Sequence, residues 1–135
     1  MSSTKMITIE STEWFPKTGD VRKLLVRYLV AERDDIGLGQ DLLGSQRKLT
    51  VSLSGTAYAL WVYRDPRLLD NANLEKVLRE FAFRKIKQEI ESEEEPSIEQ
   101  ISITSHTNDA PPSLGAKGIE IGVPQEVMIH RTQVT

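Results

Sequence analysis

The chain has 135 residues, of which 39% are hydrophobic and 27% charged, with a formal net charge of -3. This length suits one domain with a true core, although part of the chain is expected to lie outside that core. The absence of cysteine excludes disulfides and thiolate metal sites. No apolar run reaches membrane-spanning length and residues 1–10 lack a signal-peptide core, so we expect a soluble, cytoplasmic protein.

The first part of the chain predicts a strand and then a helix. Residues 6–10 alternate weakly between apolar and polar, as a short strand does, and a loop follows. Asp20 offers an N-cap oxygen for a helix that Gly37 and Gly39 would end. The apolar residues at helical spacing in this segment are Val21, Leu24, Leu25, Tyr28 and Leu29.

The middle of the chain predicts a β-hairpin. Residues 48–53 alternate with period two, which is typical of a half-buried strand. Ser54 and Gly55 supply turn chemistry, and residues 57–63 form the returning strand. Pro66 follows that strand closely, and proline cannot donate to a sheet ladder.

A second helix and a fourth strand follow the hairpin. Asp70, Asn71 and Asn73 are N-cap candidates before the helix, and the acidic run 91–95 with Pro96 ends it. Ile101 and Ile103 alternate with polar residues, as a strand does. The helical stripe consists of Leu74, Val77, Leu78, Phe81, Lys85, Ile86 and Ile90.

This order of elements predicts an α+β fold, a ferredoxin-like split βαβ sandwich (βαββαβ). It would have a four-stranded antiparallel sheet, two helices on one face and a C-terminal extension. We expect the sandwich in residues 1–104, and a flexible connector in 105–118 that contains Pro111 and Pro112. Residues 119–135 regain apolar alternation, which favours an added strand at a sheet edge, either in the same subunit or in a neighbouring one.

Charge is distributed unevenly along the chain. Residues 1–88 hold 15 Lys and Arg against 11 Asp and Glu, whereas residues 89–135 hold 2 against 9. A solvated acidic tail explains this difference and is common. The alternative is an acidic segment that shields a basic face of the domain.

Aromatic residues are the main candidates for a binding surface. On a strand over 57–63, Trp61 and Tyr63 would share one face and Tyr58 the other, so all three cannot be core residues. Trp14 and Phe15, in the first loop, form a second exposed-aromatic candidate. Tryptophan and tyrosine are enriched at protein interfaces.

Other motifs carry no convincing chemistry. Gly37 and Gly39 follow a predicted helix, whereas a dinucleotide-binding loop follows a strand. His106 and His130 are the only histidines and lie in the polar tail, where surface positions are the simplest interpretation. The crowded carboxylates of 91–95 lack the spacing of a calcium loop. The sequence therefore assigns no catalytic residue, no metal site and no cofactor.

Two functions remain as expectations from the sequence. The first is a non-enzymatic interaction or regulatory module that works as a homo-oligomer or complex subunit through its open sheet face. The second is a single-stranded RNA-binding domain in which Tyr58 or Trp61, with Tyr63, stacks on bases. The residues expected to contact phosphates in that case are Arg22, Lys48, Arg64 and Arg84.

Overall fold

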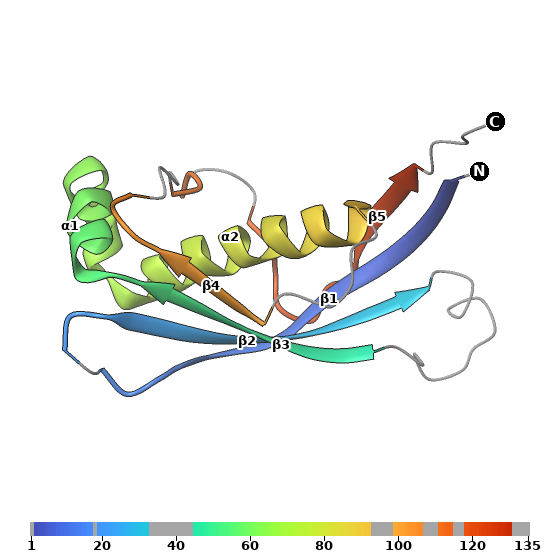
Figure 1. Cartoon of the computed structure of the whole chain (residues 1–135), viewed down its shortest axis with the longest axis horizontal. Helices are drawn as coiled ribbons and strands as arrows, with labels where there is room; N and C mark the ends of the chain where they lie inside the picture. Colours follow the sequence, from blue (N-terminus) through green and yellow to red (C-terminus); the bar gives the residue numbers. More distant parts are fainter. Residues whose placement is uncertain are drawn as a thin grey trace.

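The structure is a computed structural model, and it describes residues 2–17, 19–32, 45–92, 99–106, 111–114 and 118–130. Figure 1 shows a strongly curved sheet with one long helix along its concave side and a short helix at one end. The elements, in chain order, are β1 (Ser2–Trp14), β2 (Arg22–Glu32), β3 (Ser45–Leu53), α1 (Gly55–Arg64), the 3₁₀ turn η2 (Pro66–Leu69), α2 (Asn71–Ser92), β4 (Gln100–Ile103) and β5 (Gln125–His130).

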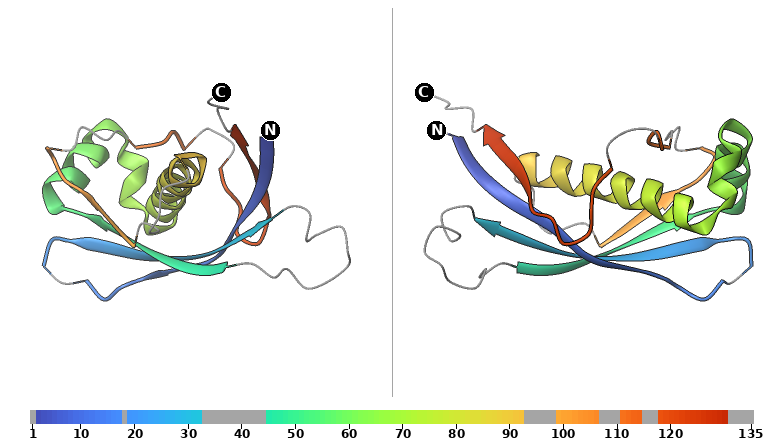
Figure 2. Two further views of the ribbon diagram at one scale, coloured as in Figure 1. Left: turned by 45° about the vertical axis from the view of Figure 1, so that its right-hand side comes forward. Right: turned by 180° about the vertical axis from the view of Figure 1, so that it is seen from behind.

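The sheet has five strands in the order β4-β3-β2-β1-β5. All neighbours are antiparallel except β3 and β4, which are parallel and joined through α1, η2 and α2. The pairing of β1 with β2 shifts register between Ile9 and Ser11, and such a bulge increases bending and twist. Both helices lie on one side of the curled sheet, and among the described residues no helix covers the convex side (Figure 2).

The ferredoxin-like sandwich predicted from the sequence is wrong, although the α+β class holds. Residues 22–32 form a central strand where a helix was expected, and residues 55–64 form a helix where a strand was expected. The sheet therefore has five strands, with one parallel pair, in place of four antiparallel ones.

The core lies between the concave side of the sheet and α2. Alternate residues of β2 point into it and are nearly or fully inaccessible to solvent: Leu24, Val26, Tyr28 and Val30. The predicted second helix is confirmed, because every apolar member of its stripe is buried. Its start is also confirmed, since an oxygen of the Asp70 carboxylate accepts a hydrogen bond from the backbone N–H of Ala72 at 2.8 Å.

The C-terminal strand β5 forms the edge of the sheet opposite β4. Strand β5 pairs with β1 over Ser2–Ile7, in the region where the sequence allowed an added edge strand. Residues 119–121 are not in a strand, and Ile119 packs against the core. Within the connector Pro112 is buried and Leu114 is half-buried. Gly37, Gly39 and most of the acidic run 91–95 lie outside the described residues.

Candidate protein interface on α1

Helix α1 starts directly at the end of β3, and two local features fix its first turn. The Ser54 side chain is an N-cap that accepts a hydrogen bond from the Ala57 backbone N–H at 3.1 Å. Gly55 packs so closely on the β1–β2 connection that a Cβ built on it would lie 2.6 Å from the Cβ of Asp20. The sequence Ser54-Gly55 thus begins a helix and does not form the predicted hairpin turn.

The inner side of α1 belongs to the core. Trp61 is only 3% exposed, and its ring centroid lies 6.3 Å from that of Phe81 on α2. Ala57 is buried beside it, while Tyr58 and Val62 are half-buried against the same core. Trp61 is therefore a core residue, and its predicted place on an open sheet face is wrong.

The outer side of α1 carries a second apolar stripe. Thr56, Ala59, Leu60 and Tyr63 are exposed and follow the spacing i, i+3, i+4, i+7, which places them on one helix face. We call these four residues the α1 face. Leu60 is 49% exposed and Tyr63 is 87% exposed. The sequence pattern indicates Tyr63 as a candidate but not the other three residues, because it favours a strand over this segment.

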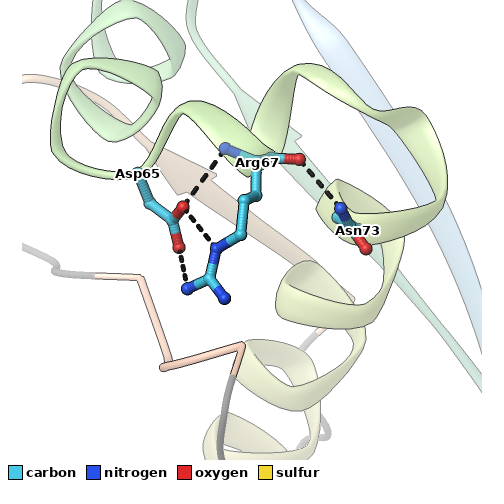
Figure 3. Close-up of polar contacts among 3 residues, drawn as sticks. All are labelled: Asp65, Arg67 and Asn73. Atoms are coloured by element: carbon cyan, nitrogen blue, oxygen red, sulfur yellow. Dashed lines mark hydrogen bonds and ion pairs between the residues drawn. The ribbon is translucent and has the colours of Figure 1, made fainter.

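The C-terminal end of α1 is fixed by a compact polar motif (Figure 3). The Arg67 guanidinium donates two hydrogen bonds to the Asp65 carboxylate, at 2.9 and 2.8 Å, and the Arg67 backbone N–H donates a third at 3.2 Å. The hydrogen bond from the Arg67 side chain lowers the pKa of Asp65 below its ordinary value. The Asn73 amide then donates to the Arg67 carbonyl at 3.0 Å, so that α1 is tied to α2 through η2.

A cleft of about 550 Å³ lies at the N-terminal end of α1. Arg22 lines this cleft, with its guanidinium carbon 4.2 Å from the centroid of the Tyr58 ring, and donates to the Asn71 side-chain oxygen at 3.1 Å. A cation at this distance from an aromatic face is attracted to it. Thr56 and Ala59 also line the cleft, so it is continuous with the α1 face.

The four predicted phosphate contacts do not come together. Lys48 lies on β3 opposite Arg27, whereas Arg64 lies in the last turn of α1. Arg84 lies 3.4 Å from the Glu80 carboxylate on α2, and Arg22 is held on Tyr58. The structure therefore offers no continuous phosphate track through these four side chains.

The second aromatic candidate is divided between core and surface. Trp14 is the last residue of β1 and packs, half-buried, against the core. Phe15 is 41% exposed, and its backbone N–H donates to the Lys23 carbonyl at 2.9 Å. The two rings therefore do not form a single exposed patch.

The Tyr28 hydroxyl is a polar group buried in the core. It is buried on β2 and makes no hydrogen bond of good geometry with the described residues. Burial, with the Glu89 carboxylate as a smaller cause, raises the pKa of Tyr28 above its ordinary value of 10.0, and the nearby Arg47 opposes this shift. A buried hydroxyl without a good partner costs folding free energy.

We expect Tyr28→Phe to stabilise the protein by about 1 kcal/mol at neutral pH, because the buried hydroxyl is removed. Because the pKa of Tyr28 is raised in the folded state, the unfolded chain ionises first as pH rises. The native protein therefore keeps its full stability below the ordinary value of 10.0 and loses stability as pH rises through the folded value. The variant should therefore lose less stability above about pH 10 than the native chain. Urea unfolding of both proteins across this range checks it, and a loss above about 1 kcal/mol at neutral pH would reveal a partner for the hydroxyl.

Comparison with known proteins gives no relative. No family model, curated protein or solved structure matches this chain. Among the described residues, no group of three or more His, Asp or Glu side chains is placed to hold a metal ion. His106 is exposed, and the side chain of His130 lies outside the described set. Within the described part of the chain, no helix is long and apolar enough to cross a membrane.

Proposed function

We propose that this chain is a non-catalytic interaction module that binds another protein through the α1 face. One observation carries the proposal: in α1, GTAYALWVYR, the only charged residue is Arg64, at the end of the helix. A surface helix normally has one apolar stripe, and a helix that is apolar all round is normally buried all round. The fold covers the Trp61 side and leaves the Tyr63 side open.

A further large apolar side chain is exposed shortly after α1 in the chain. Leu69, in the adjacent turn η2, is 63% exposed. Tyrosine is enriched at interfaces because one rigid side chain combines a large apolar area with a polar tip. Ser54 at one end and the Asp65–Arg67 motif at the other hold α1 in place. A surface held in this way loses little conformational entropy on binding, which favours affinity.

The charges around the α1 face favour a different protein over a second copy as the partner. Lys17 and Arg22 lie at its N-terminal end with Asp20, and Arg64 lies at its C-terminal end. An antiparallel pairing of two α1 helices would bring Arg64 toward Lys17 of the copy. A parallel pairing would bring Arg64 toward Arg64. Like charges in contact weaken such an interface.

The RNA-binding alternative gains no support from α1. It required Tyr58 or Trp61, with Tyr63, on one open sheet face. Trp61 is in the core, and Tyr58 is half-buried on the inner side of a helix whose outer side carries Tyr63. Base stacking by neighbouring aromatics needs rings that are presented together.

A photoreactive benzoylphenylalanine at position 63 should form discrete cross-linked adducts in the native cells of the protein. The matched control is the same residue at Met128, which is 50% exposed on β5, at the opposite end of the molecule (Figure 1). Adding Leu60→Ser should lower the yield at position 63 about tenfold, which corresponds to about 1.4 kcal/mol of binding.

The masses of the adducts decide between partners. An adduct of defined mass that is sensitive to Leu60→Ser supports the proposal. Equal labelling from positions 63 and 128 would contradict it, and so would no labelling from 63. An adduct at twice the mass of the chain would show that the α1 face binds a second copy.

A further inference from the structure

We infer that the partner presents an acidic amphipathic helix, with apolar side chains on Leu60 and Tyr63 and carboxylates at the cations that flank α1. This inference rests on the proposed function and adds the chemistry of the partner. An apolar stripe can bind any complementary apolar surface, so specificity for one partner must come from the charged groups around the stripe.

The N-terminal end of α1 favours a carboxylate. Lys17 and Arg22 line the cleft there, and Asp20 is the one carboxylate among its described lining residues. The first turn of α1 contains no acidic residue of its own, and the Asp20 side chain packs against Gly55 in that turn, so two cations face one carboxylate at this end. The half-buried Arg22 is oriented by Tyr58 and Asn71, so its charge is held in a fixed place.

The C-terminal end of α1 provides a second cation. Arg64 is exposed in the last turn of the helix, and it forms no ion pair with any described residue. The nearby Arg67 adds little net charge, because its guanidinium is paired with Asp65 at 2.8 Å. Lys17, at the other end, likewise forms no ion pair within the described part of the chain.

The spacing of these cations favours a helical ligand. Ten residues of α-helix span roughly 15 Å, so Lys17 and Arg64 bracket about three turns. A partner helix that packs along the α1 face would place apolar residues on Leu60 and Tyr63 at helical intervals. Its Asp or Glu residues, about three turns apart, would then lie near the two cations.

Two designed peptides test this inference directly. Both are amphipathic helices of about four turns with the same leucine stripe, and one carries Glu where the other carries Lys. Fluorescence anisotropy at low salt should show the acidic peptide binding at least tenfold more tightly. Raising the salt from about 50 to 200 mM should reduce this difference, because screening weakens exposed charge pairs.

Charge reversals locate the contacts on the protein. Lys17→Glu and Arg64→Glu should each weaken the acidic peptide about three- to tenfold and strengthen the basic one, as expected for rim charges. Lys87→Glu, at an exposed position on α2, is the matched control and should change neither peptide by more than about twofold. Tyr63→Ser should weaken both peptides, since it removes the shared apolar contact.

The outcomes separate this inference from the proposed function. Equal affinity for the two peptides would overturn the acidic partner while leaving an apolar interface. No binding of either peptide, with Leu60-sensitive cross-linking at position 63, would also overturn the acidic partner and leave the proposed function standing. Displacement of the acidic peptide by a single-stranded oligonucleotide, unaffected by Tyr63→Ser, would show a general anion site and overturn the inference.

Discussion

Replacing Trp61 by alanine is expected to destabilise the protein by about 3–5 kcal/mol, the usual cost of truncating a buried tryptophan or phenylalanine. Trp61 is 3% exposed and packs on Phe81, so its removal leaves a cavity between α1 and α2. Tyr63→Ala, two residues further on, should change the free energy of unfolding by about 0.5 kcal/mol or less. That side chain is 87% exposed and has little packing to lose.

This pair of variants also tests the identity of the element. On a strand, residues 61 and 63 share one face and the two substitutions would have similar effects. On a helix they point about 200° apart, and only one of them can be in the core. Urea unfolding followed by circular dichroism measures both values. A loss for Trp61→Ala within about 1 kcal/mol of that for Tyr63→Ala would contradict the helix.

The sequence identified α2 because that helix has one apolar side and one polar side. Its buried residues repeat at helical spacing, from Leu74 to Ile90, and exposed charges such as Lys76 and Lys87 separate them. The strand β3 was found for the same reason, since Leu49, Val51 and Leu53 alternate with polar residues. Periodicity is informative where only one side of an element is apolar.

The strand β2 was mistaken for a helix because apolar residues occur on both of its faces. Leu24, Val26, Tyr28 and Val30 point into the core, while Leu25 and Leu29 lie half-buried on the convex side. Taken together, Leu24, Leu25, Tyr28 and Leu29 imitate a helical stripe. The β-branched Val26 and Val30, at alternating positions, favoured a strand.

The segment of α1 was mistaken for a strand, which is the opposite error. Its apolar residues cover every side of the helix, so neither period stands out and three aromatics suggested a strand. The signals that favoured a helix were Ser54, a good N-cap, followed by Ala57 and Ala59, which have high helix propensity. The same excess of apolar residues that hid the helix is what makes the α1 face a candidate interface.

We expect Gly55→Ala to destabilise the protein by about 1–3 kcal/mol, although alanine is the better helix former. The added Cβ would lie 2.6 Å from the Cβ of Asp20 and 3.3 Å from its carbonyl oxygen. Both atoms belong to or adjoin the backbone, so the β1–β2 connection must move away from α1. That movement would also displace Lys17 and Arg22, the cations of the cleft.

The matched control is Gly118→Ala, where a Cβ would meet no atom within 4 Å. The backbone there needs no left-handed conformation, so alanine should be neutral or stabilise by about 0.4–1 kcal/mol by restricting the unfolded chain. The double variant Gly55→Ala with Asp20→Gly removes the closest contact and should recover about half of the loss or more, since residues in contact are coupled in a double-mutant cycle. Thermal unfolding of the native chain, Gly55→Ala, Asp20→Gly and the double variant measures this coupling. Additive effects at positions 55 and 20 would contradict the close approach of Gly55 to Asp20. Contacts other than this one would then have to position Lys17 and Arg22 in the cleft.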